Sequence, residues 1–291
     1  MNASRFARMR VFLRTRREKG VIELLSERRE TMAMSWLTRR RMVSCAFVLI
    51  AFCTLPANPQ NTAVSALPLL AQLSAAFSGG RVVQSVQLSG TATWYLGGLE
   101  DSGTVTLTAS TGGASQMQLA LATTGQRTES QTGAGTSASC TWVGSDAVVH
   151  NVDPGNCWRP AVWFLPAFSL QPSLLPSYVT SSDLGTSTVG SDPNALRYLQ
   201  SQLAFGTQAV ALATEITQRS TTDIGIDPVS FLPAALLYSV HPDSGAQVSI
   251  PIEILYLNYQ AVNGVQVPFH IQQYVNGSLR LDIAVTSAQI N

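Results

Sequence analysis

Two cysteines in the middle of the chain, Cys140 and Cys157, are the residues whose type and spacing indicate chemistry most directly. The other two, Cys45 and Cys53, lie in an amino-terminal apolar segment with the character of an export signal, which leaves an even pair in the rest of the chain. Exported proteins fold in an oxidising compartment, where such a pair forms a disulfide. We therefore expect a Cys140–Cys157 bridge that closes an 18-residue loop, with two separate free thiols as the alternative.

Large aromatic side chains gather on both sides of Arg159. Such a cluster is explained most simply as a plug of the core under an irregular loop, because large rings dominate core burial. The alternative is a pocket wall, since ligand pockets are mostly apolar and contain few polar groups, with Arg159 as the nearest cation that could meet an acidic head group. The predicted ligand-binding residues are Trp94, Trp142, Trp158, Arg159, Trp163, Phe164 and Phe168.

The sequence contains no recognisable motif for catalysis or for metal binding. Its histidines, His150, His241 and His270, are far apart in the chain, and His150 with Asp153 and Cys157 is explained by a polar loop that carries the disulfide. HExxH, GxSxG, a P-loop and a dinucleotide fingerprint are all missing. We expect no metal, no cofactor and no enzymatic activity, an envelope hydrolase being the least favoured class of function.

Charge divides the chain into two parts. Residues 1–42 carry twelve Lys and Arg against four Asp and Glu, whereas residues 43–291 carry six Arg, no Lys and thirteen Asp and Glu. An acidic domain without lysine cannot neutralise a phosphate backbone, which excludes nucleic acid as the expected partner.

Residues 38–57 have the three parts of a secretory signal: a basic start, an apolar run and a small residue, Ala57, after which cleavage is expected. The apolar run of about 14 residues is shorter than the roughly 20 that cross a bilayer, so a removed signal is favoured over a permanent anchor. Residues 1–37 are interpreted as the product of a misassigned start, with Met32 or Met34 as the initiator, or as a basic extension.

Two variants of export remain open. The run 38–42 loosely resembles a twin-arginine signal, which would export an already folded chain. Cys53 stands where a lipoprotein would be acylated, but the bulky Phe52 before it disfavours that reading.

Periodicity predicts a leading helix over 62–78, which ends at Gly79-Gly80, and then an antiparallel meander. Its turns are expected at 97–98 together with 101–103, at 112–113 and at 144–146. A strand and a flexible loop are expected over 125–139. Five prolines over 153–176 indicate short helical turns packed on the sheet. The expected strands of this part are 82–96, 104–109, 116–122, 140–144 and 147–150.

The last third of the sequence has the clearest pattern. Asn263-Gly264 and Asn276-Gly277 are hairpin turns, since a type I′ turn needs positive φ at both positions. A strand is expected over 196–205 and an amphipathic helix over 207–219. The other expected strands are 221–226, 234–241, 248–261, 265–275 and 278–290.

Two phrases of this third resemble a known family. They are D-P-x-x-x-L-P, from Asp227 to Pro233, and Y-x-x-V-N-G-V-x-V-P-F, from Tyr259 to Phe269. With the signal, the leading helix and the long meander, they are similar to the LolA-like superfamily of bacterial periplasmic lipoprotein carriers and its uncharacterised exported relatives. The resemblance covers about residues 221–291, whereas the amino-terminal half matches only in layout.

The resemblance implies a mostly β (α+β) fold, in which a curved antiparallel sheet forms a half-open β-barrel closed by a few helices. Residues 58–291 are then a single domain, and the protein is expected to be a monomer. Its concave apolar face would hold a lipoprotein acyl chain or a similar hydrophobic ligand in the periplasm or cell envelope of a Gram-negative-type bacterium. Membrane contact would be limited to the signal segment or to transient encounters.

The expected function is therefore a non-enzymatic binding or carrier protein for a lipid-like or other hydrophobic ligand. The alternative is a structural or interaction module of the cell envelope whose concave face is filled by its own helices.

Overall fold

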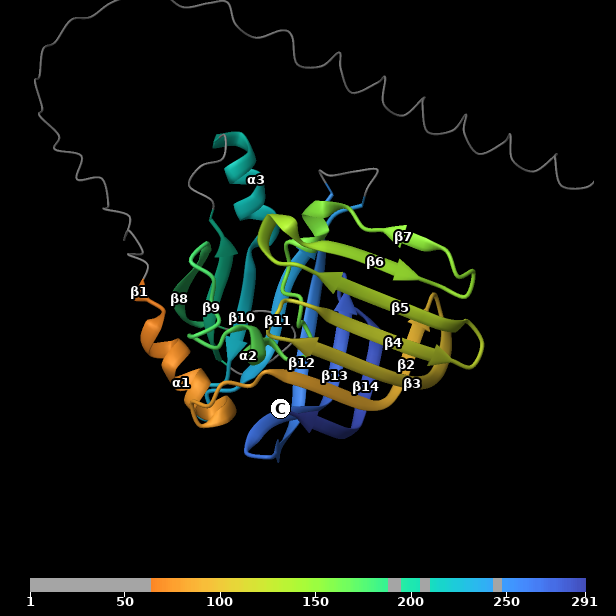
Figure 1. Cartoon of the computed structure of the whole chain (residues 1–291), viewed down its shortest axis with the longest axis horizontal. Helices are drawn as coiled ribbons and strands as arrows, with labels where there is room; N and C mark the ends of the chain where they lie inside the picture. The colour runs from red at the N-terminus through yellow and green to blue at the C-terminus, as the bar shows by residue number, and fades with distance from the viewer. Residues whose placement is uncertain (1–63, 188–194, 205–209, 243–247) are drawn as a thin grey trace, which may run out of the picture. The chain divides into compact units, whose positions relative to one another are not determined.

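The computed structural model describes residues 64–187, 195–204, 210–242 and 248–291 (Figure 1). All of them belong to one compact unit, Gln60–Asn291. The predicted signal at 38–57 and the segment 1–37 lie outside the described residues. No helix in the described part of the chain is long and apolar enough to cross a membrane.

The first half of this unit contains one helix and a run of strands. Its elements are β1 (Val64–Ser65), α1 (Leu67–Ser78), β2 (Ser85–Leu96), β3 (Leu99–Ser110), β4 (Ser115–Leu121), β5 (Gly125–Thr132), a 3-10 turn (Gly135–Ser137), β6 (Ser139–Val143) and β7 (Val149–Asn151).

Short helical turns separate this half from a second run of strands. The later elements are a 3-10 turn (Pro154–Cys157), α2 (Pro166–Ser169), β8 (Val179–Ser187), β9 (Leu196–Leu203), α3 (Val210–Ser220), β10 (Thr222–Ile226), β11 (Pro233–Val240), β12 (Ile250–Val262), β13 (Val265–Val275) and β14 (Ser278–Ile290).

The fourteen described strands form one antiparallel sheet in the order β1-β8-β9-β10-β11-β12-β13-β14-β2-β3-β4-β5-β6-β7. The sheet contains two meanders, β2–β7 and β8–β14, and within each of them the paired strands are neighbours in sequence. The sheet is open, with β1 and β7 at its edges, and it curls so that β4–β6 cross in front of β12–β14 in Figure 1. The predicted fold class, a mostly β protein with a curved antiparallel sheet and few helices, is confirmed.

The pairing of β14 with β2 joins the two meanders. It runs from Leu281 opposite Trp94 to Ile290 opposite Val86, with a bulge between Val285 and Ser287. The end of the chain extends the contact, because the Asn291 carbonyl accepts hydrogen bonds from the backbone N–H groups of Gln84 and Ser85, at 2.7 and 3.2 Å. Residues almost 200 positions apart in sequence are thereby adjacent in one sheet.

Helix α1 packs on the sheet through a stripe of fully buried side chains at helical spacing, Leu69, Leu73 and Phe77. It ends where expected, because Gly79 takes the left-handed conformation with φ of 63° and donates its N–H to the carbonyl of Ala75. The helix begins later than predicted, since Val64 and Ser65 pair with β8.

Both Asn-Gly turns are confirmed. Asn263 and Gly264 have φ of 51° and 78°, and Asn276 and Gly277 have φ of 51° and 74°. Positive φ at both central residues matches the right-handed twist of the flanking strands, which sets the register of β12, β13 and β14.

Residues 158–176, here called the covering segment, lie on the concave face of the sheet. Hydrogen bonds hold the segment there: Ser115 Oγ donates to the Ala161 carbonyl at 2.6 Å, and Tyr256 donates to the Trp163 carbonyl. Gln171 exchanges two with the backbone of Val83, since its Nε2 donates to the carbonyl at 3.1 Å and its Oε1 accepts from the N–H at 2.7 Å. Its apolar side chains complete the main core, namely Val162, Phe164, Leu165, Ala167, Phe168 and Leu170. The short helical turns predicted for this region are thus present.

The structure corrects two expectations. Asp101–Gly103 is not a turn but belongs to β3, because the hairpin closes at Gly97-Gly98 and Asp101 pairs with Trp94. The Asp101 carboxylate accepts hydrogen bonds from the N–H groups of Thr123 and Thr124 of the next turn. Strand β8 was not predicted, because its polar sequence lacks an apolar alternation and it forms by pairing with β9.

The close approach of β2 and β14 at Gly90 generates a prediction. A Cβ at this position would clash with the backbone carbonyl of Ala284 and lie 2.8 Å from the Cα of Val285. Backbone cannot move aside as a flexible side chain can, so we expect Gly90→Ala to lower the free energy of unfolding by about 1–3 kcal/mol. Urea unfolding followed by circular dichroism measures the change.

Gly112→Ala is the matched control, because the nearest atom to its added Cβ is Ser110 Oγ at 3.9 Å. Equal unfolding midpoints for the two variants would contradict the close packing at the junction of the meanders.

Candidate functional site

Two adjoining cavities lie between the sheet and the covering segment. The larger, of about 470 Å³, is here called the arginine cavity, and the smaller, of about 300 Å³, the apolar cavity. Gln131, Arg159 and Ala161 line both, so these three residues form the shared wall.

The arginine cavity is built from both meanders. Strands β4, β5 and β6 form one side, and β13 and β14 form the other, which follows from the curl of the sheet. Side chains from these strands, β2 and the covering segment line it, including Trp94, Met117, Arg127, Glu129, Trp142, Trp163, Phe164, Gln273, Val275, Arg280 and Leu281.

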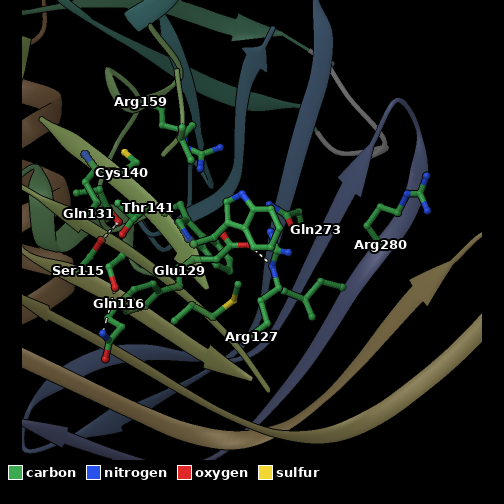
Figure 2. Close-up of a pocket in the computed structure, with 18 of the residues that line it drawn as sticks. Ser115, Gln116, Arg127, Glu129, Gln131, Cys140, Thr141, Arg159, Gln273 and Arg280 are labelled. Atoms are coloured by element: carbon green, nitrogen blue, oxygen red, sulfur yellow. Dashed lines mark hydrogen bonds and ion pairs between the residues drawn. The ribbon is translucent and has the colours of Figure 1, made fainter. Parts of the chain in front are cut away.

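Arg127 lies at the centre of this cavity (Figure 2). Its guanidinium carbon is 5.1 Å from the ring centroid of Trp94 and 4.5 Å from that of Trp142, and its Nε donates to the Glu129 carboxylate at 2.7 Å. The positions 127, 129 and 131 alternate along β5, so their side chains share the concave face. Trp142 is held in turn by stacking on His150, with centroids 3.9 Å apart.

Arg159 stands in the shared wall, where its guanidinium carbon is 5.8 Å from the ring centroid of Tyr238. Burial raises the pKa of Tyr238 above its ordinary value, although the nearby positive charge of Arg159 opposes the rise. Tyr238 therefore remains a neutral phenol at neutral pH. A neutral phenol adds no negative charge beside Arg159.

Arg280 lies on the other side of Arg127 from Arg159 in the view of Figure 2. It comes from the start of β14 and donates a hydrogen bond to the backbone carbonyl of Tyr95 at 3.1 Å. The pairing of β14 with β2 thus positions a third arginine on the cavity wall.

The apolar cavity lies between the covering segment and strands β8–β10. Ser201, Leu203, Thr222 and Ile224 contribute from β9 and β10. Its remaining lining is dominated by apolar groups of the covering segment, namely Trp158, Pro160, Val162, Pro166, Phe168, Leu170, Leu174, Leu175 and Pro176.

Cys140 of β6 lines the arginine cavity and Cys157 lines the apolar cavity. The structure brings the two residues together as a bonded pair with Cα atoms 5.7 Å apart, within the range of disulfides. Both are buried, and Gln131 Nε2 donates to the Cys157 carbonyl at 3.2 Å. The pair therefore ties the beginning of the covering segment to β6.

The seven residues predicted to bind a ligand all lie on the walls of these cavities. Trp94, Trp142, Trp163 and Phe164 line the arginine cavity, Trp158 and Phe168 line the apolar cavity, and Arg159 lines both. Phe164 and Phe168 are also fully buried in the main core. These two side chains therefore form part of the cavity walls and part of the core at the same time. Their role in binding stays a prediction.

Sequence reasoning missed Arg127, Glu129, Gln273 and Arg280. A usable signal existed for the first two, because alternate charged residues in a short strand of a lysine-free domain mark one face. Arg280 offered no such signal, since its place depends on the pairing of β14 with β2.

The described histidines do not form a metal site. His150 is 3.3 Å from Asp146, and His270 is 2.7 Å from Asp282, whereas His241 contacts the Val248 carbonyl at 3.1 Å. Nowhere among the described residues do three His, Cys, Asp or Glu side chains come together in an arrangement that could hold a metal ion.

No protein-family model matches the chain, and no curated protein matches it in sequence. Similar solved structures include a proposed outer membrane lipoprotein-sorting protein domain from Vibrio parahaemolyticus, at 9% identity and a TM-score of 0.47, over 77% of this chain and 92% of that one. A DUF1329 family protein from Desulfovibrio piger has the same identity, TM-score and share of this chain, with 91% of its own length covered.

A LolA superfamily protein from Nitrosomonas europaea is similar at 12% identity and a TM-score of 0.45, over 79% of this chain and 94% of that one. The likeness concerns the fold, and the functional argument rests on the residues of this chain.

The cysteine pair provides a prediction about stability. Replacing both residues by serine, Cys140→Ser with Cys157→Ser, should lower the free energy of unfolding by about 3 kcal/mol, because the cross-link restricts the unfolded chain. Denaturant unfolding of the oxidised protein and of the variant gives the difference.

Thiol titration in denaturant without reductant is the independent check. We expect no reactive thiol from Cys140 or Cys157 in the protein purified without reductant, and two reactive thiols would refute the bridge.

Proposed function

We propose that this protein is an exported, non-enzymatic binding or carrier protein that takes a lipid-like or other hydrophobic ligand in the periplasm or cell envelope. The observation that supports the proposal is the apolar cavity beneath the covering segment, which adjoins a second cavity with cationic walls. A cysteine pair at bonding distance fits an oxidising compartment.

The volumes of about 300 and 470 Å³ fall in the range of small-molecule sites. Such sites are lined mostly by apolar and aromatic groups with a few polar ones, as the apolar cavity is, whereas polar and apolar groups line the arginine cavity about equally. An extended apolar chain fits a lining of leucine, proline and phenylalanine because it needs no hydrogen-bond partner.

The composition of the covering segment explains why the cavities exist. Its prolines interrupt both helix and ladder hydrogen bonding, so the segment forms only the single turn of α2 and irregular backbone. Irregular backbone cannot pack on the sheet with the regular spacing of a long helix. Space therefore remains on either side of the shared wall.

The second candidate function is a structural or interaction module of the cell envelope. One observation favours it, namely that the covering segment already fills part of the concave face with buried core side chains such as Val162, Phe164 and Leu165. The carrier proposal is preferred because the same segment leaves both cavities open.

A variant that fills the shared wall tests the proposal. Ala161 lines both cavities, so Ala161→Phe should reduce the uptake of a fluorescent fatty acid at least tenfold while the protein stays folded. Fluorescence titration measures uptake, and thermal unfolding reports on folding.

Ala71→Phe is the control, because Ala71 is exposed on α1 and the change adds the same side chain outside the cavities. We expect the Ala71→Phe variant to take up the fluorescent fatty acid as the wild-type protein does. Absence of uptake by the wild-type protein, or equal uptake by both variants, would refute binding in these cavities.

A further inference from the structure

The arginines of the folded part are unevenly distributed. Six arginines occur after residue 42, and three of them, Arg127, Arg159 and Arg280, line one cavity that contains a single carboxylate, Glu129. The same part of the chain carries thirteen acids and is acidic as a whole. Positive charge is therefore concentrated in a cavity where walls of low dielectric strengthen its field.

Most of these arginines have an anionic or carbonyl partner. Arg127, Arg197 and Arg219 pair with carboxylates, while Arg81 and Arg280 donate to backbone carbonyls. Arg159 differs from the other five arginines in the described part of the chain, since the structure records for it no hydrogen bond to a carbonyl and no ion pair with a described carboxylate. Its recorded contacts are both with Tyr238, one with the ring and one a side-chain hydrogen bond to the phenol.

The position of Arg159 is equally specific. The residue lines both cavities, so it lies where the apolar space adjoins the more polar one. Guanidinium groups bind carboxylate and phosphate oxygens through two parallel N–H donors. A molecule with an apolar chain and an anionic end would match this order of environments.

The surroundings of Arg159 do not neutralise it. Tyr238 is held as a neutral phenol because burial raises its pKa. Glu129 is bound to Arg127 at 2.7 Å, and Gln131 and Gln273 contribute uncharged amides to the same cavity. The positive charge is thus available to a ligand.

We propose that Arg159 is the head-group site for an acidic amphiphile, binding a carboxylate or phosphate oxygen of a ligand whose chain occupies the apolar cavity. This inference rests on the proposed function and adds the chemical class of the ligand. Arg280 adds a further positive charge on the wall of the arginine cavity, whereas the charge of Arg127 is balanced by Glu129.

Matched ligands test the inference. Dodecanoate, dodecyl phosphate and methyl dodecanoate share one chain length and differ in the charge of the head. We expect the wild-type protein to bind at least one of the two anions about tenfold or more tightly than the methyl ester, the size of a charge-assisted hydrogen bond. Which anion is preferred distinguishes a fatty-acid ligand from a phosphorylated one.

Two variants locate the effect. Arg159→Gln keeps hydrogen-bond donors but removes the charge, so it should abolish the preference for the anions while the affinity for the methyl ester stays within twofold. Arg81→Gln makes the same change of net charge outside both cavities and should retain the wild-type preference. Circular dichroism of each variant confirms folding.

The outcomes separate the two proposals. Equal binding of anions and ester by the wild type would overturn head-group recognition and leave the proposed function intact. A preference that survives in Arg159→Gln would overturn the assignment of Arg159. Binding of none of the three ligands would refute the proposed function, and this inference with it.

Discussion

The structure depends on the antiparallel pairing of the last strand, β14, with β2. Each meander is local in sequence and could pair its own strands without the other, but this single contact makes them one sheet. The continuous sheet then curls, and β4–β6 come to face β13 and β14 across a cavity. Trp94 and Arg280 are brought to the same wall by this pairing. Gly90 permits it, since any side chain there would meet the backbone of β14.

A curled sheet with an apolar concave face must be covered, and here the cover is irregular. Hydrogen bonds from Ser115, Tyr256 and Gln171 and the cysteine pair fix the covering segment at four places. Between these places its prolines prevent the dense packing of a long helix. The result is a concave face that is partly core and partly cavity, with Arg159 at the boundary. The architecture thereby combines a hydrogen-bonded sheet with an apolar space and a cation that has no carboxylate partner among the described residues.

Local chemistry determined how much could be predicted from sequence. The Asn-Gly turns and the end of α1 were predictable because positive φ is a property of one or two residues. Strand β8 was not, because its polar residues form a strand only through pairing with β9 and β1. The aromatic cluster was visible in the sequence as a short run around Arg159. Arg127 reaches the same cavity through the alternation of side chains along β5, and Arg280 reaches it through the pairing of β14 with β2. Sequence could name candidate wall residues, but the existence of a cavity depends on packing across the whole sheet.

The central claim is that the concave face holds a hydrophobic ligand. Native mass spectrometry of the protein purified from its own cells, followed by organic extraction, tests it most directly. The account predicts a bound species whose mass and fragments identify an acyl chain, released when the protein is denatured. Repeated recovery of the bare chain, together with no uptake of added fatty acid, would contradict it and favour a face filled by its own covering segment.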